Sequence, residues 1–515
     1  MASGEIVDLL VVGGGVNGAG IARDAAGRGL SVLLCEQDDL ASHTSSASTK
    51  LIHGGLRYLE HYEFSLVRKA LQERELLLRL APHIIAPLRF VMPHVSSLRP
   101  AWMIRAGLFL YDNLSKRELL PGSRGIDFRK HVAGAPLKKT LSKGFVYSDA
   151  SVQDARLVVL NAMDAKERGA TILTRTRMIQ ARQGSQYWDA TLLSTETGET
   201  SEVRARCIVN AAGPWVASLL NGALNTPAQH HIRLVKGSHI VTKRLFDHDH
   251  AYIFQNPDKR IVFAIPYEND FTLIGTTDVE YSADPSKVGI SEEETAYLCE
   301  SVSRYFETAV TPQQVVWSYA GVRPLLEEEV ANPSAVTRDY KLELRNEPGL
   351  APVLSVFGGK ITTYRRLAEE VMEHLQPLFG YMKSHWTAHE ALPGGDIANA
   401  DFAEFLRIFQ QRHAWLPASL ATRYARAYGT RTARLLDGIH DVAALGELFG
   451  ADLYEVEVRY LMRNEWALTV EDILWRRSKL GLRLDAVAVD RLRTWLQEQA
   501  QVSVSAPAPA AAMPA

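Results

Sequence analysis

The sequence predicts an α/β protein in three parts: a parallel sheet with flanking helices, a mixed antiparallel β domain and an α-helical C-terminal domain. Three observations support this prediction. Short apolar runs alternate with an alanine-rich segment near the N-terminus, β-rich segments follow at hairpin-like spacing in the middle, and the chain beyond residue 395 has helical periodicity. A chain of 515 residues is long enough for several hydrophobic cores.

The first part begins with an expected strand at residues 6–12, a helix to residue 28 and a second strand at 31–35. A buried run at 207–213 is expected to rejoin this sheet. The predicted domains are 1–90, 145–215 and 350–380 for the first sheet, 91–144 and 216–349 for the β domain, 381–501 for the helices and 502–515 for a disordered tail of alanine and proline.

A glycine turn separates the first expected strand from the first helix. Gly13, Gly15 and Gly18 fit the pattern G-x-G-x-x-G. The first glycine permits a tight turn, the second lets the backbone approach a pyrophosphate, and the third allows close helix–strand packing. The helix N-terminus then offers N–H groups and a positive dipole end to phosphates. The alternative is a turn that serves packing alone.

Glu36 strengthens the prediction of a nucleotide site. It ends the second expected strand, where an acid accepts hydrogen bonds from ribose hydroxyls and repels the 2′-phosphate of NADP. Strand, glycine turn, helix and terminal acid together predict a Rossmann-like dinucleotide-binding domain.

The composition argues against several other classes of protein. A net charge of -2 does not favour a general nucleic-acid binder. The three cysteines form neither a metal-ligand pair nor a C-x-x-C motif, so we expect no metal and a reducing, cytoplasmic location. We also expect no membrane-spanning helix and no secretion signal, because no apolar stretch reaches about 18 residues and the N-terminus lacks a basic region followed by an apolar one.

Further motifs follow in order along the chain. They are TSSASTKLIHGGLRY at 44–58, NAAGPW at 210–215, KGSH at 236–239, GTTD at 275–278, GVRP at 321–324 and FGGK at 357–360. Together with the glycine turn, these motifs resemble the FAD-dependent glycerol-3-phosphate dehydrogenases of the respiratory type, which are related to the D-amino-acid oxidases. The resemblance covers about residues 6–375, and the helical remainder resembles the family's C-terminal domain. Thr49 stands where we expect serine in the close bacterial pattern.

The resemblance implies FAD as the cofactor and a FAD-binding domain of the D-amino-acid-oxidase and glutathione-reductase type. The implied cofactor contacts are Gly13, Gly15, Val16, Asn17, Gly18, Glu36, Gln37, Ser45, Ser46, Thr49, Lys50, Leu51, His53, Gly54, Gly55, Met178, Ala212, Gly213, Trp215, Gly358, Gly359, Lys360, Ile361 and Thr362.

The reaction implied by the resemblance is hydride transfer from C2 of sn-glycerol 3-phosphate to the flavin N5, which yields dihydroxyacetone phosphate. Arginine suits the phosphate because its planar fork binds phosphate oxygens and keeps its charge. The candidates are Arg57, Arg323 and Arg338, with Tyr58 and Thr362 as further substrate contacts. The alternative for each arginine is a surface ion pair.

The candidate catalytic residues are His239, Arg323, His53 and Lys360. A histidine titrates near neutral pH, so His239 is the expected general base, with His53 beside the flavin or substrate. An arginine-assisted alkoxide is the alternative. Lys360 would hold its ammonium near the flavin N1 and C2 oxygen, where negative charge builds on reduction, unless it is an ordinary lysine at a helix start.

The resemblance also implies electron transfer to ubiquinone, and therefore peripheral attachment to the inner face of the cytoplasmic membrane. Two segments are candidate lipid contacts: the apolar, aromatic residues 101–111 and the basic, aromatic residues 475–480. The alternatives are a core helix and a solvated basic face. A homodimer is compatible with the sequence.

Two rival functions stay open from the sequence. One is an amine or amino-acid oxidase on the same fold, which would use an arginine for a carboxylate. The other is a flavin-binding module without catalysis. Several cationic residues favour phosphate over a carboxylate, and His53, Arg57, His239 and Arg323 together argue against a module.

Overall fold

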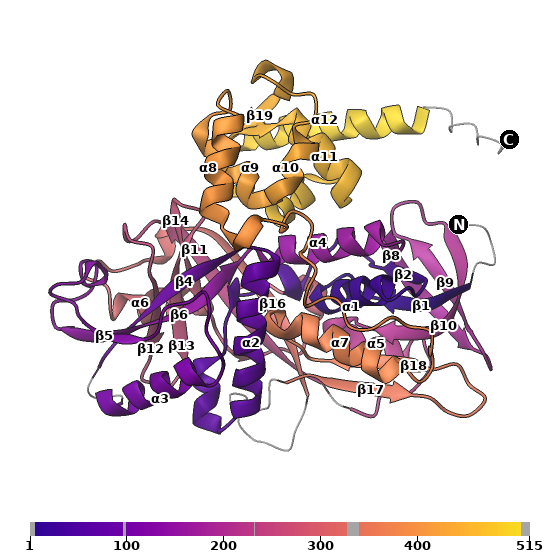
Figure 1. Ribbon diagram of the computed structural model, residues 1–515, viewed down its shortest axis with the longest axis horizontal. Coiled ribbons are helices and arrows are strands. Elements are labelled where there is room, and N and C mark those ends of the chain that lie inside the picture. The colour runs from indigo at the N-terminus through magenta and orange to yellow at the C-terminus, as the bar shows by residue number, and fades with distance from the viewer. Residues whose placement is uncertain (1–5, 96–98, 231, 327–338, 506–515) are drawn as a thin grey trace.

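The computed structural model describes residues 6–95, 99–230, 232–326 and 339–505. This part of the chain contains two large sheets and a separate group of C-terminal helices, which lies above the sheets in Figure 1. The predicted three-part α/β architecture is therefore confirmed.

The first sheet has the order β17-β18-β10-β1-β2-β7, and β9 and β8 continue from β10 as an antiparallel meander. β1 pairs in parallel with both β2 and β10, and β10 pairs in parallel with β18. The expected return of residues 207–213 to this sheet is confirmed. The strands are β1 (Ile6–Val12), β2 (Val32–Cys35), β7 (Thr171–Leu173), β8 (Thr176–Gln183), β9 (Trp188–Ser194), β10 (Thr200–Asn210), β17 (Lys341–Arg345) and β18 (Val353–Phe357).

Helices cover both faces of this sheet because its strands alternate their apolar side chains. Leu9 and Val11 of β1 point to one core with α1 (Val16–Gly27), α4 (Asp154–Glu167) and α7 (Tyr364–Leu375). Leu10 and Val12 point to the opposite core, which includes α5 (Val216–Asn221) and the meander. A strand with both faces buried appears in the sequence as a continuous apolar run, as residues 9–12 do.

The second sheet has the order β15-β11-β14-β13-β12-β4-β6-β3, with β16 paired to β11 and β5 paired to β6. The strands β11 to β14 and β16 form the expected antiparallel β domain. The elements are β3 (Leu51–Ile52), β4 (Ile85–Pro93), β5 (Arg124–Asp127), β6 (Lys143–Val152), β11 (Ile232–Lys243), β12 (Ala251–Gln255), β13 (Ile261–Tyr267), β14 (Phe271–Gly275), β15 (Val279–Glu280), β16 (Val315–Leu326), α2 (Phe64–Leu80), α3 (Ala101–Asn113) and α6 (Glu292–Ser303).

The second sheet corrects the expected division of the chain. The predicted boundary after residue 90 cuts through β4, and the boundary at residue 145 cuts through β6. These two strands pair with each other from Ile85 to Pro93, in the second sheet and not the first. The apolar character of such a strand shows that it is buried, but not which sheet buries it.

The C-terminal region contains α8 (Phe402–Arg412), α9 (Ala418–Tyr428), α10 (Thr432–Leu435), α11 (Glu455–Glu465), the π-helix η11 (Asp472–Arg477) and α12 (Ala486–Ser505). A small hairpin of β19 (Leu448–Gly450) and β20 (Leu453–Tyr454) interrupts the helices. The predicted start of the tail at residue 502 is wrong, because α12 continues to Ser505, ahead of the first proline of the tail. Residues 506–515 lie outside the described residues.

The helical domain packs on the first sheet's helices through paired charges. Arg156 of α4 is bonded to Glu465 of α11, and both side chains are buried. Arg431 is bonded to Glu167 at the end of α4 with Nη1–Oε1 at 2.7 Å, nearer the surface. Breaking a buried pair on one side leaves an uncompensated charge, so the first contact makes the domain arrangement specific.

His83 lies fully buried where the helical domain meets the end of α2. Carbon atoms added at Gly394 and Gly429 would come within 3.1 and 3.0 Å of its ring. Burial, together with the charges of Arg156 and Arg426, lowers the pKa of His83 to about 3. The native protein therefore holds this ring neutral.

Stability should fall as the pH drops from about 6.5 toward 3, because the unfolded chain binds a proton that the native ring does not. The loss approaches about 1.4 kcal/mol per pH unit within this window. We expect His83→Gln to have a smaller drop in unfolding temperature between pH 7 and pH 5 than the unmodified protein. Exposed His440→Gln is the control, and equal pH dependence in the two variants would contradict this prediction.

Candidate active site

The glycine turn follows β1 at the carboxyl edge of the first sheet. Gly13 has φ +114°, and a Cβ atom added there would lie 2.5 Å from the carbonyl oxygen of Ala211 at the end of β10. A Cβ atom at Gly18 would lie 1.9 Å from the Gly13 carbonyl oxygen. No side chain fits at either position, so glycine brings β1, β10 and α1 into direct contact.

The N-terminus of α1 is suited to an anion. Gly15 is its N-cap and has no side chain to cap it, and its first turn holds no acidic residue. Ser45 Oγ accepts the Val16 N–H at 2.9 Å. The Oδ1 atom of Asn17 is buried without a hydrogen-bond partner among the described residues. A bound phosphate would meet the positive end of the helix here.

Glu36 lies beside this turn at the end of β2. Its Oε2 accepts the Gly14 N–H at 2.6 Å, and its Oε1 accepts the Asp38 N–H at 3.0 Å. Burial raises the pKa of Glu36, while the two backbone N–H groups oppose this shift. The neighbouring Gln37 accepts the Thr195 hydroxyl at 3.2 Å through its carbonyl oxygen, and Met178 of β8 is buried behind β2. Glu36 therefore lies at the end of β2 beside the glycine turn, as expected, and its contact to a ribose stays a prediction.

The segment from residue 44 to 55 crosses between the two sheets. It includes Ser45 and Ser46 in a short 3₁₀ turn, η1 (Thr44–Ser46), and the buried Leu51 of β3. Lys50 is 5% exposed, and its Nζ donates to Ser46 O at 2.9 Å and to Asp154 Oδ2 at 2.8 Å. The ammonium of Lys50 thus serves an internal ion pair, so a cofactor contact of this residue would come from its backbone.

The turn after β18 meets α1 from the other side. Gly358 and Gly359 have φ +80° and +106°. Asn17 Nδ2 donates to the Gly358 carbonyl oxygen at 3.1 Å, and a Cβ atom at Gly359 would lie 2.5 Å from the same Nδ2. Ile361 and Thr362 follow in η7 (Ile361–Thr363). The motif at 357–360 therefore lies at the same sheet edge as the ends of β1 and β10. The turn η4 (Gly213–Trp215) follows Ala212 at this edge.

Four of the predicted residues meet beside this turn. The Lys360 ammonium lies 4.2 Å from the ring centre of Tyr58, and the His53 N–H donates to Thr362 Oγ1 at 3.3 Å. Tyr58 and the partly buried Arg57 lie on η2 (Leu56–His61). Gly55, with φ +74°, admits the Tyr58 ring, since a Cβ atom there would come within 2.3 Å of it.

Gly54 rests on a buried polar pair that the sequence did not indicate. Its N–H donates to Tyr111 Oη at 2.8 Å, and the Tyr111 hydroxyl donates to Asp149 Oδ1 at 2.7 Å. Arg74 Nη1 also donates to Asp149 Oδ1 at 2.7 Å. These residues stand at 74, 111 and 149, outside every motif, and only the folded chain joins them to the 44–55 segment.

His239 lies on β11 and contacts the same segment. Its Nε2 lies 3.0 Å from Thr49 Oγ1, and its ring stacks on Tyr319 with centres 4.8 Å apart. Burial, with the charges of Lys50 and Arg323, holds the pKa of His239 well below 6.5. Its Nδ1 has no hydrogen-bond partner within the described ranges. A neutral imidazole with an accepting nitrogen is therefore present next to Arg323.

Tyr319 is a residue that the sequence analysis missed. It lies opposite His239 in the pairing of β16 with β11, and its hydroxyl donates to the Ser48 carbonyl oxygen at 2.8 Å. The sequence offers no local signal for this contact, because the register between strands separated by about 80 residues decides it. Tyr319 therefore contacts both the His239 ring and the backbone of the 44–55 segment.

Arg323 is oriented by the GTTD motif. Its Nη1 lies 3.0 Å from Asp278 Oδ1, and its Nη2 donates to the Thr277 carbonyl oxygen at 3.1 Å. Gly237 makes room for the guanidinium, because a Cβ atom there would lie 2.3 Å from Nη2. The predicted substrate contact Arg338 lies outside the described residues. The structure therefore describes two of the three predicted arginines, Arg57 and Arg323.

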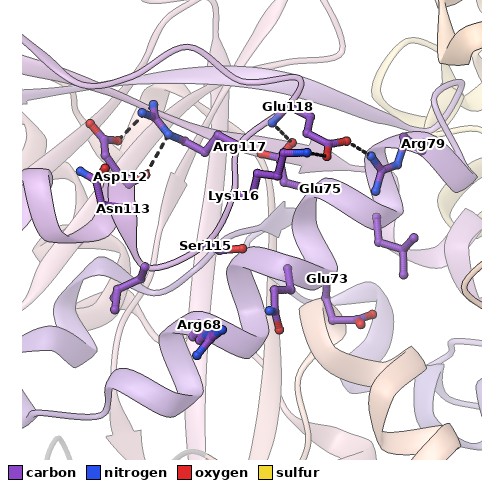
Figure 2. Close-up of a pocket in the computed structure, with 13 residues that line it drawn as sticks. Arg68, Glu73, Glu75, Arg79, Asp112, Asn113, Ser115, Lys116, Arg117 and Glu118 are labelled. Carbon is purple, nitrogen blue, oxygen red and sulfur yellow. Dashed lines mark hydrogen bonds and ion pairs between the residues drawn. The ribbon is translucent and has the colours of Figure 1, made fainter.

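A separate cavity of about 780 Å³ lies between α2 and the loop that follows α3 (Figure 2). Its walls are charged, but the charges pair with one another: Arg79 and Lys116 bond Glu118, and Arg117 bonds Asp112. This cavity does not include the glycine turn or the motif residues described above. The predicted site residues instead gather at the carboxyl edge of the first sheet.

The geometry is that expected of a dinucleotide-dependent oxidoreductase: a glycine turn and a helix N-terminus suited to phosphates, an acid at a strand end, and a histidine, a lysine and arginines beyond them. The FAD dependent oxidoreductase family model matches residues 8–365, and that of the C-terminal domain of alpha-glycerophosphate oxidase matches residues 385–502. The chain belongs to the FAD-dependent oxidoreductase family, and its cofactor is FAD.

The chain is similar to named proteins over nearly its whole length. It is 57% identical to a glycerol-3-phosphate dehydrogenase of Pseudomonas aeruginosa, over 96% of each chain. It is 52% identical to a D-erythritol 1-phosphate dehydrogenase of Brucella abortus, over 94% of this chain and 96% of the other. The crystal structure of a glycerol-3-phosphate dehydrogenase from Bacillus halodurans complexed with FAD is 26% identical and superposes with a TM-score of 0.77, covering 96% of this chain and 91% of that one.

Proposed function

We propose that the protein oxidises sn-glycerol 3-phosphate to dihydroxyacetone phosphate. The observation that carries this proposal is the pair of strands β11 and β16, which holds an oriented arginine and a buried neutral histidine against the cofactor-binding segment. The similarity to the Pseudomonas aeruginosa enzyme supports the same substrate class. When bound, FAD supplies the hydride acceptor.

In this proposal each residue has a separate task. Arg323 and Arg57 bind the phosphate, and the contacts of Arg323 to Asp278 and Thr277 set the angle of its guanidinium. His239 accepts the hydroxyl proton, for which its neutral state is required. His53 and Thr362 form one wall of the site, and the Lys360 ammonium offsets negative charge beside Tyr58.

A second candidate substrate is D-erythritol 1-phosphate, because the relative from Brucella abortus named for it is 52% identical. Both substrates are polyol phosphates with a secondary alcohol, so the same arginine and histidine chemistry serves either.

The purified protein with bound FAD should lose its visible flavin absorbance on mixing with glycerol 3-phosphate under nitrogen. Faster bleaching by D-erythritol 1-phosphate would assign that substrate instead, and bleaching by glycine or an amine alone would indicate an amine oxidase.

Arg323→Ala should keep bound FAD but lose turnover by about two to four orders of magnitude, since the phosphate would no longer be positioned. Arg323→Lys should recover part of the loss, because it keeps the charge without the fork. Steady-state kinetics and the flavin-to-protein absorbance ratio measure these effects. Arg260→Ala, which removes an arginine from the surface of the second sheet, is the control. Unchanged turnover in Arg323→Ala would remove this residue from the site.

The proposed electron acceptor is a membrane quinone, reached from the cytoplasmic face of the membrane. In the described ranges, no helix is long and apolar enough to cross a bilayer. The helix α3 instead exposes an apolar surface: Trp102 is 71%, Phe109 63% and Met103 47% exposed. These residues lie within the segment 101–111, in which Leu108 and Tyr111 are buried, and we propose their exposed side as the lipid contact. The helix α3 lies well away from the C-terminal helices (Figure 1).

The other expected lipid contact, residues 475–480, is wrong as a surface feature. Trp475 stacks on Trp317 with ring centres 4.6 Å apart, and Arg477 is 2% exposed. Lys479 bonds the Trp475 carbonyl oxygen. A basic, aromatic run in the sequence has the same composition whether it faces lipid or another domain, and here it faces the second sheet.

Replacing both Trp102 and Phe109 with serine should weaken binding to vesicles of anionic phospholipid at least tenfold. Each aromatic ring contributes about 2 kcal/mol when it leaves water. Vesicle flotation at low salt measures the bound fraction. Val487→Ser is the control, because Val487 is 78% exposed on α12 of the helical domain. Equal binding by the double variant and the unmodified protein would exclude α3 as the membrane contact.

A further inference from the structure

The segment from Glu36 to Ala47, here called the cofactor loop, joins two predicted cofactor contacts. Glu36 begins it, and Ser45, which holds the Val16 N–H, lies near its end. Ala41 N donates to the Gly14 carbonyl oxygen at 3.1 Å, so the loop also touches the glycine turn. Any displacement of the loop would therefore move Glu36 and Ser45 together.

Asp39 lies in the middle of the cofactor loop, is 2% exposed and points away from the cofactor edge into the helical domain. Arg476 Nε donates to its Oδ2 at 2.6 Å. Arg477 donates from Nη1 to Oδ2 and from Nη2 to Oδ1, both at 2.7 Å. Both arginines come from the π-helix η11, more than 430 residues along the chain. A bidentate, buried arginine–carboxylate pair is among the strongest polar contacts in proteins.

A second contact holds the loop from the side of the first sheet. The Arg175 N–H donates to the Asp38 carbonyl oxygen at 2.7 Å, and the Arg175 guanidinium bonds Asp472 Oδ2 at 2.5 Å. Asp472 is the first residue of η11. Arg175 has φ +51°, a conformation uncommon for residues other than glycine, which fits a backbone held in place by its partners.

A cavity lies beside these contacts. A cavity of about 190 Å³ lies between the cofactor loop at His43, Thr44 and Ser46 and the helix η11 at Trp475 and Arg476. Its lining also includes Trp215 and Tyr319, so η11 borders the same cavity as the predicted cofactor contacts Ser46 and Trp215. π-helical turns are rare and occur often at functional sites.

We propose that Arg476 and Arg477 are positioning residues for FAD, which act through Asp39 to hold the cofactor loop in its binding conformation. The helical domain is then a determinant of cofactor affinity, although it contributes none of the motif residues. Without the clamp, the loop would have to be ordered at the moment of binding, and the entropy of that ordering would be subtracted from the affinity.

The test compares two variants of the clamp with a matched control. Asp39→Asn removes the carboxylate charge, and Arg476→Gln removes the ion pairs of Arg476 with Asp39 and Asp472 from a side chain that is 17% exposed. The control, Arg431→Met, breaks the Arg431–Glu167 pair, which joins the same helical domain to α4 without touching the cofactor loop. The dissociation constant of FAD is measured by fluorescence titration of the apoprotein. Amide hydrogen exchange of residues 37–47 is measured on the same samples.

We expect Asp39→Asn and Arg476→Gln to raise the dissociation constant of FAD at least tenfold and to speed exchange at 37–47. Arg476→Lys should recover part of the affinity, and Arg431→Met should match the unmodified protein in both measurements. Where Asp39→Asn does not fold, Arg476→Gln decides the outcome. Unchanged affinity in Arg476→Gln, or an equal loss of FAD in Arg431→Met, would overturn the proposal, since the arginines would then serve domain docking alone.

Discussion

The parallel pairing of β1 with β2 and β10, and of β10 with β18, is the constraint on which the rest of the structure depends. Parallel strands end at the same edge of a sheet. Gly13, Glu36, Ala212 and Gly358, which follow or end these four strands, therefore meet at one edge although about 340 residues of chain separate the first from the last. The glycines permit this convergence, because a Cβ atom at Gly13 would collide with β10. The cofactor site is a consequence of that edge.

The second sheet and the helical domain complete the site from opposite sides. The register of β11 with β16 places His239 against Tyr319, and the segment before β3 supplies Thr49 to the same ring. The π-helix η11 contacts both bodies, with Trp475 on Trp317 of β16 and Arg477 on Asp39. The C-terminal helical domain therefore connects the two sheets through η11.

Much of the site could be predicted because motifs encode local backbone demands. The glycine turn, the strand-end acid and the GGK turn all appear where the sequence places them, and His53, Tyr58, Lys360 and Thr362 meet as expected. Their catalytic and binding roles stay predictions. The wrong predictions are the domain boundaries at 90 and 145 and the lipid contact at 475–480. Each depends on which distant element covers the segment, and the composition of the segment does not show that.

The sequence alone determined the dinucleotide fold and the motif residues, because tight turns and helix starts are local and only a few residue types permit them. The resemblance that those motifs carry implied FAD. The tertiary structure decided the partners of those residues. In the folded chain the Lys50 ammonium bonds Asp154, the His239 ring contacts Thr49, and Asp39 bonds Arg477 of η11. The helix α3 keeps an exposed apolar surface. Each of these outcomes depends on contacts between distant segments, and the burial of a side chain and the shift of its pKa follow from such contacts.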